Sequence, residues 1–375
     1  MIDPALKSPL AGNCVARAAS IGDRLAALGA RYDAAPLYPL DSMALLIDAG
    51  LHLTFAPVAS GGERFADPVA RHQAMMDVLR HVGRADLSIG RLFEGHVNAL
   101  ELLGWYGSDA QRRVLGRNLA AGAIYGVWAS EPPPGVALVE ADGRTTLRGE
   151  KFFASGAGGI TQAVVTVQPA SGKGRLALVP ADDPARADLS GWRVRGMRAT
   201  GSGRYSLDGL NIEPDDLIGI PGDYDREPRF TTGAWRFTAV QLGGIEALLV
   251  ETRSAMRAPA RDDPVQRARF ADAVAATRTA YLWVRECALR AASDDPDGPA
   301  FARMTRGVVE RAALDVVEMA ARITGTLSAM DGTRIDKITR DLSLYLRQGG
   351  PDHARDQAAL TWLDHDAWGG GDELW

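Results

Sequence analysis

The spacing of apolar residues changes twice along the chain. In the first 124 residues they recur every three or four positions, which predicts helices over 15–28, 43–51, 69–82 and 87–106. The period then shortens, which predicts a hairpin turning at Asp142-Gly143 and strands over 163–167, 175–179, 192–195 and 204–212. From Phe237 the helical period returns over 239–256, 268–293, 301–323 and 335–346. We therefore expect a helical domain over 1–124, an antiparallel β barrel or sandwich over 125–222 and a helical bundle over 223–375.

Composition narrows the possible partners. The net charge of −5 argues against a nucleic-acid binder, because neutralising phosphates needs a basic surface. No stretch approaches the roughly 18 apolar residues of a membrane span, and the amino terminus lacks the pattern of a signal peptide. Cys14 and Cys287 have no paired spacing that would build a zinc site. We expect a cytoplasmic protein with neither a structural metal nor a membrane partner.

Two stretches of the β region combine aromatic, small and hydroxyl-bearing residues. The first, over 127–132, reads Val-Trp-Ala-Ser-Glu-Pro, and the second, over 151–158, reads Lys-Phe-Phe-Ala-Ser-Gly-Ala-Gly. Small residues let a flat ring approach the backbone, and glycines tolerate the angles at which a strand turns away. Together the two stretches predict one flat cofactor held between strands.

The helix expected over 87–106 contains a histidine on its apolar face. His96 aligns with the leucine and phenylalanine positions, whereas Glu94 lies on the polar face. His96 is either a core histidine bonded to backbone or a proton donor or acceptor that lines a pocket. Glu94 is either a solvated or interhelical carboxylate or a residue that closes the bottom of a substrate cavity.

Several motifs, in order, resemble those of the acyl-CoA dehydrogenase family of flavoproteins. Ala-Ser-Glu-Pro at 129–132 is similar to its Thr-Glu-Pro signature, and the stretch 149–156 is similar to its Gly-x-Lys-x-Trp-Ile-Thr-Asn run. Arg322-Ile-Thr-Gly325 and Arg340-Asp341 keep the spacing of two further family elements. The resemblance implies a helical N-terminal domain, a middle β domain and a C-terminal four-helix bundle.

The resemblance also implies a cofactor and its contacts. FAD would lie with its isoalloxazine ring against the β domain, where Phe153 stands at the family's aromatic position. Ser155 stands at the family's threonine position, from which a hydroxyl can donate to flavin N5. The backbone around Val127, Ala129 and Ser130 would bond the pyrimidine edge of the ring.

In this family the adenosine diphosphate half of FAD reaches a neighbouring subunit, so the resemblance implies a homodimer or homotetramer. Arg257 is the candidate for contact with the pyrophosphate. Arg261 is the alternative, because the family's Arg-x-x-Phe-Gly pattern is absent near Arg257. Arg322 and Gly325 would help to hold the same half of the cofactor.

The positions that supply the family's catalytic base depart from its pattern. Counted from Arg340-Asp341, the usual glutamate position falls on Gly349, and the alternative site falls on Trp235. Neither residue can remove the proton that α,β-dehydrogenation requires. The loop after Glu131-Pro132 is also shorter than its family counterpart. The nearest ionisable replacements are Asp352 and His353.

The motifs leave three functions open. The leading one is a dehydrogenase that oxidises a coenzyme A- or carrier-linked acyl thioester by hydride transfer to flavin N5. Its base would be Asp352, His353 or Glu94. An electron-transfer flavoprotein is a possible partner. The second is a flavin-dependent monooxygenase acting on another small organic substrate, in which His96, His353 and Ser155 would line the flavin and a flavin reductase would supply electrons. The third is a flavin-binding protein that has lost its chemistry.

Overall fold

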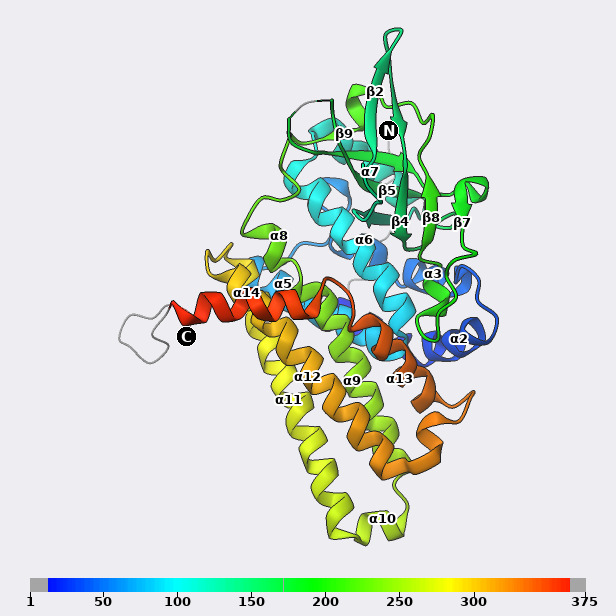
Figure 1. Cartoon of the computed structure of the whole chain (residues 1–375), viewed down its shortest axis with the longest axis vertical. Coiled ribbons are helices and arrows are strands. Elements are labelled where there is room, and N and C mark those ends of the chain that lie inside the picture. Colours follow the sequence, from blue (N-terminus) through cyan, green and yellow to red (C-terminus); the bar gives the residue numbers. More distant parts are fainter. Residues whose placement is uncertain (1–12, 171, 365–375) are drawn as a thin grey trace.

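The computed structural model describes residues 13–170 and 172–364, and its elements follow an order of helices, strands and helices (Figure 1). The first helices are α1 (Cys14–Ser20), α2 (Gly22–Ala34), α3 (Leu40–Asp48), α4 (Leu51–Thr54), α5 (Pro68–Ala85), α6 (Leu87–Tyr106) and α7 (Asp109–Ala120). The strands are β1 (Tyr125–Trp128), β2 (Ala137–Ala141), β3 (Arg144–Arg148), β4 (Glu150–Ala154), β5 (Gln162–Val167), β6 (Arg175–Pro180), β7 (Ala187–Asp188), β8 (Gly203–Ser206) and β9 (Leu217–Ile218). The last helices are α8 (Arg229–Thr232), α9 (Trp235–Ala255), α10 (Ala258–Asp262), α11 (Pro264–Ala292), α12 (Gly298–Thr324), α13 (Arg334–Tyr345) and α14 (Pro351–Leu363).

Side-chain caps fix where the first long helices begin. The Asp67 carboxylate accepts a hydrogen bond from Ala70 N at 2.7 Å, and Pro68 occupies the first position of α5, where a missing N–H does no harm. Asp86 caps α6 in the same way through Ile89 N at 3.0 Å. Each cap satisfies a backbone donor that would otherwise lack a partner inside the helix.

The β region contains three small sheets. One has the strand order β1-β5-β6-β9, the second pairs β2 with β3, and the third has the order β4-β8-β7. The expected hairpin is confirmed, since Asp142 and Gly143 both adopt the positive φ that a tight hairpin turn needs. The expectation that every pair is antiparallel is wrong for β1 and β5, which run parallel. The excursion through β2, β3 and β4 gives the chain room for that crossover.

The strand expected over 192–195 does not form. The segment is irregular there and continues into a loop that binds helix α13 in place of a neighbouring strand. The carbonyl of Arg195 accepts from the Arg340 guanidinium, and Met197 N donates to the Asp341 carboxylate. A side chain built at Gly196 would lie 2.1 Å from the Arg340 carbonyl oxygen, so only glycine permits this approach.

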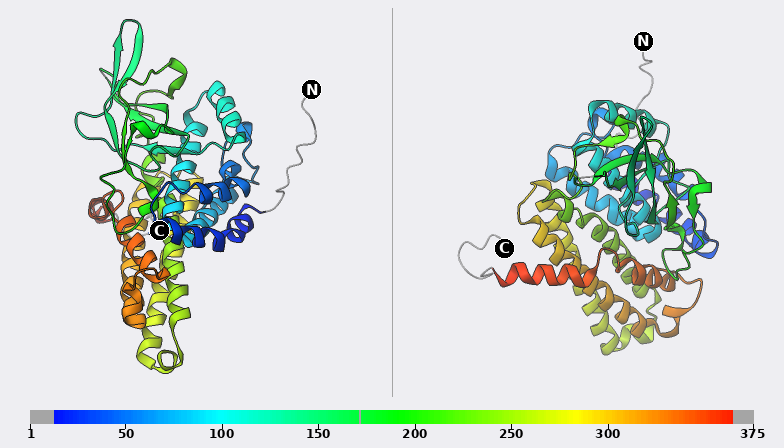
Figure 2. Two further views of the ribbon diagram at one scale, coloured as in Figure 1. Left: turned by 90° about the vertical axis from the view of Figure 1, so that its right-hand side faces the viewer. Right: turned by 45° about the horizontal axis from the view of Figure 1, so that its top comes forward.

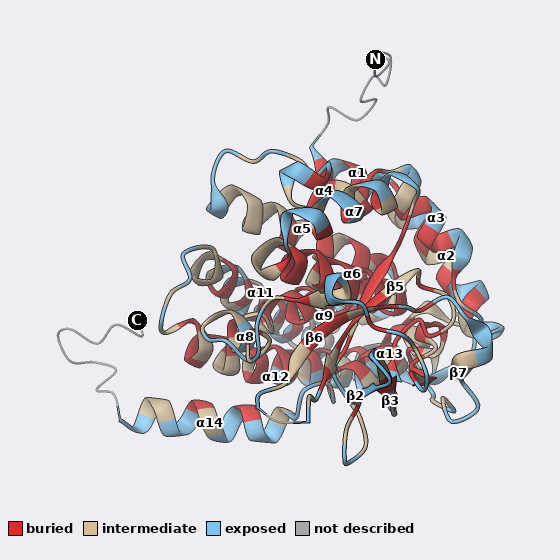
Figure 3. Ribbon diagram, turned by 90° about the horizontal axis from the view of Figure 1, so that it is seen from above, coloured by how far each residue is buried: buried red, intermediate tan, exposed pale blue. Residues whose placement is uncertain are grey.

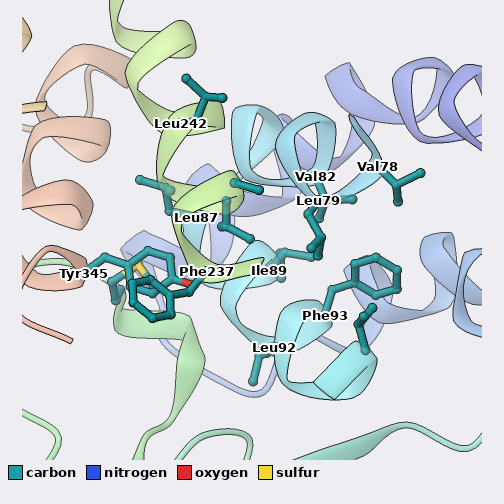
Figure 4. Packing of buried hydrophobic residues seen from close by; sticks show 14 of the residues in the cluster. Val78, Leu79, Val82, Leu87, Ile89, Leu92, Phe93, Phe237, Leu242 and Tyr345 are labelled. Carbon is teal, nitrogen blue, oxygen red and sulfur yellow. The ribbon is translucent and has the colours of Figure 1, made fainter. Parts of the chain in front are cut away.

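The helical core forms where α5, α6 and α9 meet. Figure 4 shows its apolar side chains, and Figure 3 shows that buried residues concentrate in these helices and in the strands beside them. Helices α5 and α9 touch through glycines: a side chain at Gly83 would lie 2.3 Å from the Val240 carbonyl oxygen. Helices α11, α12 and α13 pack around α9 to complete the C-terminal bundle.

The C-terminal bundle extends away from the strands. Helices α9, α11 and α12 run from the strand end of the molecule toward α10 at the opposite end, in both Figure 1 and Figure 2. Within the described ranges, the helices lack the combination of length and apolar character needed to cross a membrane. The same residues contain no cluster of three His, Cys, Asp or Glu side chains suited to a metal ion.

Candidate active site

A cavity of about 450 Å³ lies between the β region and the C-terminal helices. Helix α6 supplies one wall, β1 contributes Val127, and α9 and α12 supply the opposite wall. The turn between α13 and α14 closes one side with Gly349 and His353. Apolar groups dominate the exposed lining, so the cavity suits a small organic molecule. Its principal side chains are Glu94, Asn98, Trp105, Arg229, Arg236, Phe237, Arg303, Arg306 and His353.

Glu94 is the carboxylate of this lining, and it is already bonded on both oxygens. The side chain is buried, and its Oε2 accepts from Arg91 Nη1 at 2.8 Å. Asn98 Nδ2 donates to its Oε1, while Asn98 Oδ1 accepts from Arg236 Nε. The ion pair lies within α6, because Arg91 and Glu94 are three residues apart on that helix, and Asn98 links the pair to Arg236 of α9. Glu94 is therefore buried and bonded, and it also lines the cavity.

Arginines outnumber carboxylates along the cavity wall. Burial lowers the pKa of Arg236, whose guanidinium lies 5.9 Å from the centre of the Trp105 ring. Arg229 donates to Asp294 at 2.7 Å. Burial also lowers the pKa of Arg306, although the nearby Glu310 carboxylate opposes that shift. Sequence reasoning missed these arginines because their common cavity forms only in the folded chain.

The turn between α13 and α14 brings His353 to the cavity. Gly349 and Gly350 have φ angles of 68° and 62°, which lets the chain reverse direction within two residues. His353 then lies in the first turn of α14 and lines the cavity. Gly349 also lines the cavity and offers no side chain, as expected from its position in the sequence.

The structure separates Asp352 and Trp235 from this cavity. The Asp352 side chain is 92% exposed and accepts from Arg355 Nη2 at 2.7 Å, so it faces solvent. Trp235 is fully buried and packs near His72, with ring centres 5.8 Å apart. Of the candidate replacements for the missing base, His353 therefore lines the cavity and Asp352 does not.

His96 has the first of its two expected roles, that of a core histidine. It is fully buried, and its Nε2 lies 2.9 Å from the His52 carbonyl oxygen. Its Nδ1 accepts from Tyr125 N at 3.0 Å. Because both ring nitrogens serve the backbone, His96 has no nitrogen left for a substrate. Burial lowers the pKa of His96 to about 4, so the ring is neutral.

The two stretches that predicted a flat cofactor lie side by side. Ser130 follows β1, and its carbonyl accepts from Phe152 N at 2.8 Å. Phe153 has a φ of 50°, and the residue is 65% exposed, which excludes simple core packing. The Ser155 hydroxyl lies 2.8 Å from that of Ser202. An open aromatic face beside backbone groups and a hydroxyl fits a planar heteroaromatic ring.

A buried lysine, Lys151, connects the two stretches. Lys151 Nζ donates to the Thr166 carbonyl at 2.6 Å and to its hydroxyl at 2.8 Å, and it pairs with the Glu131 carboxylate. Glu131, which belongs to the first stretch, is therefore paired with Lys151 of strand β4. Burial lowers the pKa of Lys151 to about 7. The sequence placed Lys151 in the motif but did not indicate that it joins the two stretches.

The residues expected to hold the second half of FAD lie far from the cavity. Arg257 precedes α10, and Arg322 and Gly325 lie at the C-terminal end of α12, at the end of the bundle opposite the strands (Figure 1). Arg322 donates to Glu318 at 2.8 Å, and Arg261 binds carbonyls at the end of α9. Within one chain these residues do not meet Val127, Ala129, Phe153 or Ser155.

The order of elements and the cavity between strands and bundle define a class of proteins. Residues 227–355 match the family described as acyl-CoA dehydrogenase, C-terminal domain. Butyryl-CoA dehydrogenase from Megasphaera elsdenii superposes with a TM-score of 0.81 over 93% of this chain and 97% of that chain, at 16% identity. The chain therefore has the acyl-CoA dehydrogenase fold, as its motifs predicted.

Two further proteins to which the chain is similar are named dibenzothiophene monooxygenases. Dibenzothiophene monooxygenase TdsC from Paenibacillus sp. A11-2, solved with FMN and indole, superposes with a TM-score of 0.83 over 94% of this chain and 98% of that chain, at 20% identity. Dibenzothiophene monooxygenase from Rhodococcus erythropolis is 29% identical over 161 residues. That match spans 40% of this chain and 39% of the relative, about two fifths of each.

Proposed function

We propose that the protein is a flavin-dependent monooxygenase on the acyl-CoA dehydrogenase fold. The observation that carries this proposal is the cavity wall: Gly349 offers no carboxylate, and Glu94 is already bonded to Arg91 and Asn98. A dehydrogenase needs a base for the α-proton of its substrate, whereas a monooxygenase does not. The names of the relatives support the same choice, so we rank the monooxygenase above the dehydrogenase that the motifs favoured.

Bound reduced flavin would supply two electrons to O₂, so that one oxygen atom enters the substrate and the other leaves as water. The residues of this chain would position the reactants. Phe153 and the backbone after β1 would support the ring, and the Ser155 hydroxyl would face it. His353 would donate or accept a proton at the substrate side, where it lines the cavity. Trp105 and Phe237 would limit the entry of water.

We propose FMN in preference to FAD. The elements that would bind an adenosine diphosphate half depart from the family pattern. Arg322-Ile-Thr-Gly325 is followed by Thr326 where the family has a second glycine, and no Arg-x-x-Phe-Gly follows Arg257. Arg322 is also engaged by Glu318. The TdsC structure contains FMN, which has no adenosine diphosphate half.

An anaerobic experiment separates the two reactions. The chain is loaded with FMN, and butyryl-CoA is added without oxygen while the visible absorbance of the flavin is recorded. We expect no bleaching, because Gly349 stands where the family has its glutamate and the one carboxylate of the described lining, Glu94, is bonded to Arg91 and Asn98. After photochemical reduction of the flavin, admission of air with indole, dibenzothiophene or a small aryl acid should give an oxygenated product from at least one of these compounds.

The two outcomes lead to different conclusions. Bleaching by butyryl-CoA would establish a dehydrogenase and overturn the proposal. Reoxidation that gives only hydrogen peroxide with indole, dibenzothiophene and small aryl acids would also count against a monooxygenase. A chain that binds a flavin but gives neither bleaching nor an oxygenated product would leave the third function, a flavin-binding protein that has lost its chemistry.

A further inference from the structure

Arg306 is a buried cation on the cavity wall without a hydrogen-bond partner. The residue is only 5% exposed, and neither its Nε nor its Nη1 has a partner among residues 13–170 and 172–364. The guanidinium lies 5.6 Å from the centre of the Phe237 ring. A cation–π contact compensates only part of the cost of removing a guanidinium from water. Arg306 lines the cavity, and its Nε would lie 3.7 Å from a Cβ atom built at Gly349, which lines the same cavity.

The neighbouring carboxylates bind other arginines. Glu310, one turn further along α12, forms no ion pair with Arg306 within 4.0 Å. Its Oε2 lies 3.5 Å from Arg355 Nη1 but has no hydrogen-bond partner among the described residues. Asp352 is bonded to Arg355, and Glu94 to Arg91. A native fold rarely leaves the hydrogen-bond donors of a buried guanidinium without acceptors, unless a ligand or a water supplies them.

A second arginine extends this cationic wall. Arg303 lies one turn before Arg306 on α12 and lines the same cavity. No hydrogen bond or ion pair joins Arg303 to another residue of the described chain. Gly349 lies beside Arg306: a Cβ atom built there would lie 3.7 Å from Arg306 Nε, and glycine leaves that space open. The space can hold an acidic group that belongs to a ligand.

We infer that the substrate is a small organic anion whose carboxylate or sulfonate-type group binds Arg306, with Arg303 beside it. This inference deepens the proposed function, on which it rests, because it names the chemical class of the compound to be oxygenated. Trp105 and Phe237 would contact the apolar body of the substrate, so aryl and short alkyl acids fit the cavity of about 450 Å³. A guanidinium binds such oxyanions through two parallel N–H donors.

Calorimetric titration of the full chain, with and without FMN, tests the inference. The probes are benzoate, phenylacetate and benzenesulfonate, each compared with its neutral amide. We expect at least one anion to bind at least about tenfold more tightly than its amide, because the amide leaves the buried guanidinium unpaired. Arg306→Gln should remove that preference and weaken anion binding at least about tenfold, while Arg306→Lys should retain part of it.

Arg311→Gln is the matched control. Arg311 lies on the same helix, but it is exposed and bonded to Asp315. Its substitution should leave anion and amide binding unchanged. Thermal unfolding followed by circular dichroism shows whether Arg306→Gln folds, and we expect its Tm to equal or exceed that of the parent, because an unpartnered buried charge is removed.

Other results would overturn the inference. One is the absence of a preference for any of the three anions. Another is an Arg306→Gln variant that binds FMN at least about tenfold more weakly but binds riboflavin normally, because Arg306 would then serve the flavin phosphate. Failure of the monooxygenase proposal is distinguishable, since the flavin-free titration measures the anion preference without any turnover.

Discussion

His353 is the imidazole that the fold delivers to the cavity, and its place depends on two glycines. Replacing His353 by alanine should lower kcat by roughly 10²-fold, because it removes a positioned proton donor or acceptor. Flavin affinity and Tm should be unchanged, since the side chain is exposed at the start of α14. Steady-state turnover, flavin titration and thermal unfolding measure the three quantities.

The control for His353 is its neighbour in the same helical turn. Asp352→Asn removes a carboxylate that is 92% exposed and bonded to Arg355, so turnover should stay within about twofold. Equal losses in the two variants would show that the first turn of α14, and not the imidazole, matters. Unchanged turnover in His353→Ala would remove the residue from the mechanism.

His96 makes the stability of the protein depend on pH. Burial lowers its pKa to about 4, whereas an unfolded histidine titrates near 6.5. Between these values the unfolded chain binds the proton and the folded chain does not. The contribution of neutral His96 is therefore complete above pH 6.5 and is lost as pH falls toward 4, by up to about 3 kcal/mol.

Urea unfolding of the parent and of His96→Gln at pH 7.5 and pH 5.0 measures this effect. The parent should lose more free energy of unfolding between the two pH values than the variant, by about 2 kcal/mol. The variant should keep some pH dependence, because burial also lowers the pKa of His52, His72 and His81. An identical dependence in both proteins would contradict the assignment to His96.

The sequence could predict candidate residues more readily than their contacts. The helical pattern placed His96 on an apolar face, but the backbone groups that occupy its nitrogens come from His52 and Tyr125, far away in the chain. Arg306 lacks a hydrogen-bond partner in the described part of the chain because of where the side chains of Glu310 and Arg355 point. The spacing of residues in the sequence does not predict those directions. Asp352 and His353 are adjacent in sequence, yet the turn of α14 sends them to different surroundings.

Helices and strands could be predicted where capping residues and apolar spacing mark them in the sequence. Helix α6 begins and ends where the apolar period predicted, because Asp86 caps its start and Gly107 follows its end. The strand over 192–195 is absent because its backbone binds α13 instead of a strand. Helix α14 gave no amphipathic signal, since only small residues such as Ala354 and Ala358 are buried along it.

A buried charge cluster holds α13 against α6. Lys337 Nζ lies 2.7 Å from Asp86 Oδ2 and 2.6 Å from Asp341 Oδ2, and both carboxylates are almost fully buried. Burial alone would lower the pKa of Lys337, but the two carboxylates raise it instead. Because Asp86 caps α6 and Asp341 binds Met197 N, the cluster joins three segments at one point.

Lys337→Met should destabilise the fold by about 3–5 kcal/mol, because two buried carboxylates would lose their cation. Urea unfolding at pH 7.5 measures the change. Arg311→Met is the comparison, and its exposed pair with Asp315 should be worth less than about 1 kcal/mol. A loss in Lys337→Met as small as that of the comparison would show that the cluster does not hold α13 in place.

At the scale of the whole molecule, the cavity is built from segments spread over the chain. Helix α6, strand β1, helices α9 and α12 and the turn before α14 each contribute one part of its lining. The order of helices, strands and helices sufficed to predict the fold. The cavity could not be predicted in the same way, because it depends on close contacts such as that of Gly83 with Val240, which set the distance between helices.

The distance between the two expected flavin sites leads to a prediction about the cofactor. Arg257 and Arg322 lie at the end of the bundle opposite Phe153 and Ser155, so in one chain they cannot contact the same flavin (Figure 1). If FMN is the cofactor, Arg257→Gln combined with Arg322→Gln should leave FMN affinity within about twofold, since no phosphate reaches them. Fluorescence titration with FMN and FAD measures both affinities.

The same double variant tests the expected homo-oligomer. If the cofactor is FAD shared between subunits, the variant should bind FAD at least about tenfold more weakly, because two charge-assisted contacts with its pyrophosphate would be lost. The parent should then also be a dimer or tetramer by light scattering. Ser155→Ala is the control at the other site, and it should weaken FMN and FAD equally, because its hydroxyl would face the ring that both flavins share. A double variant that weakens FMN as much as FAD would contradict both cofactor assignments and would place the phosphate of FMN at the far end of the bundle.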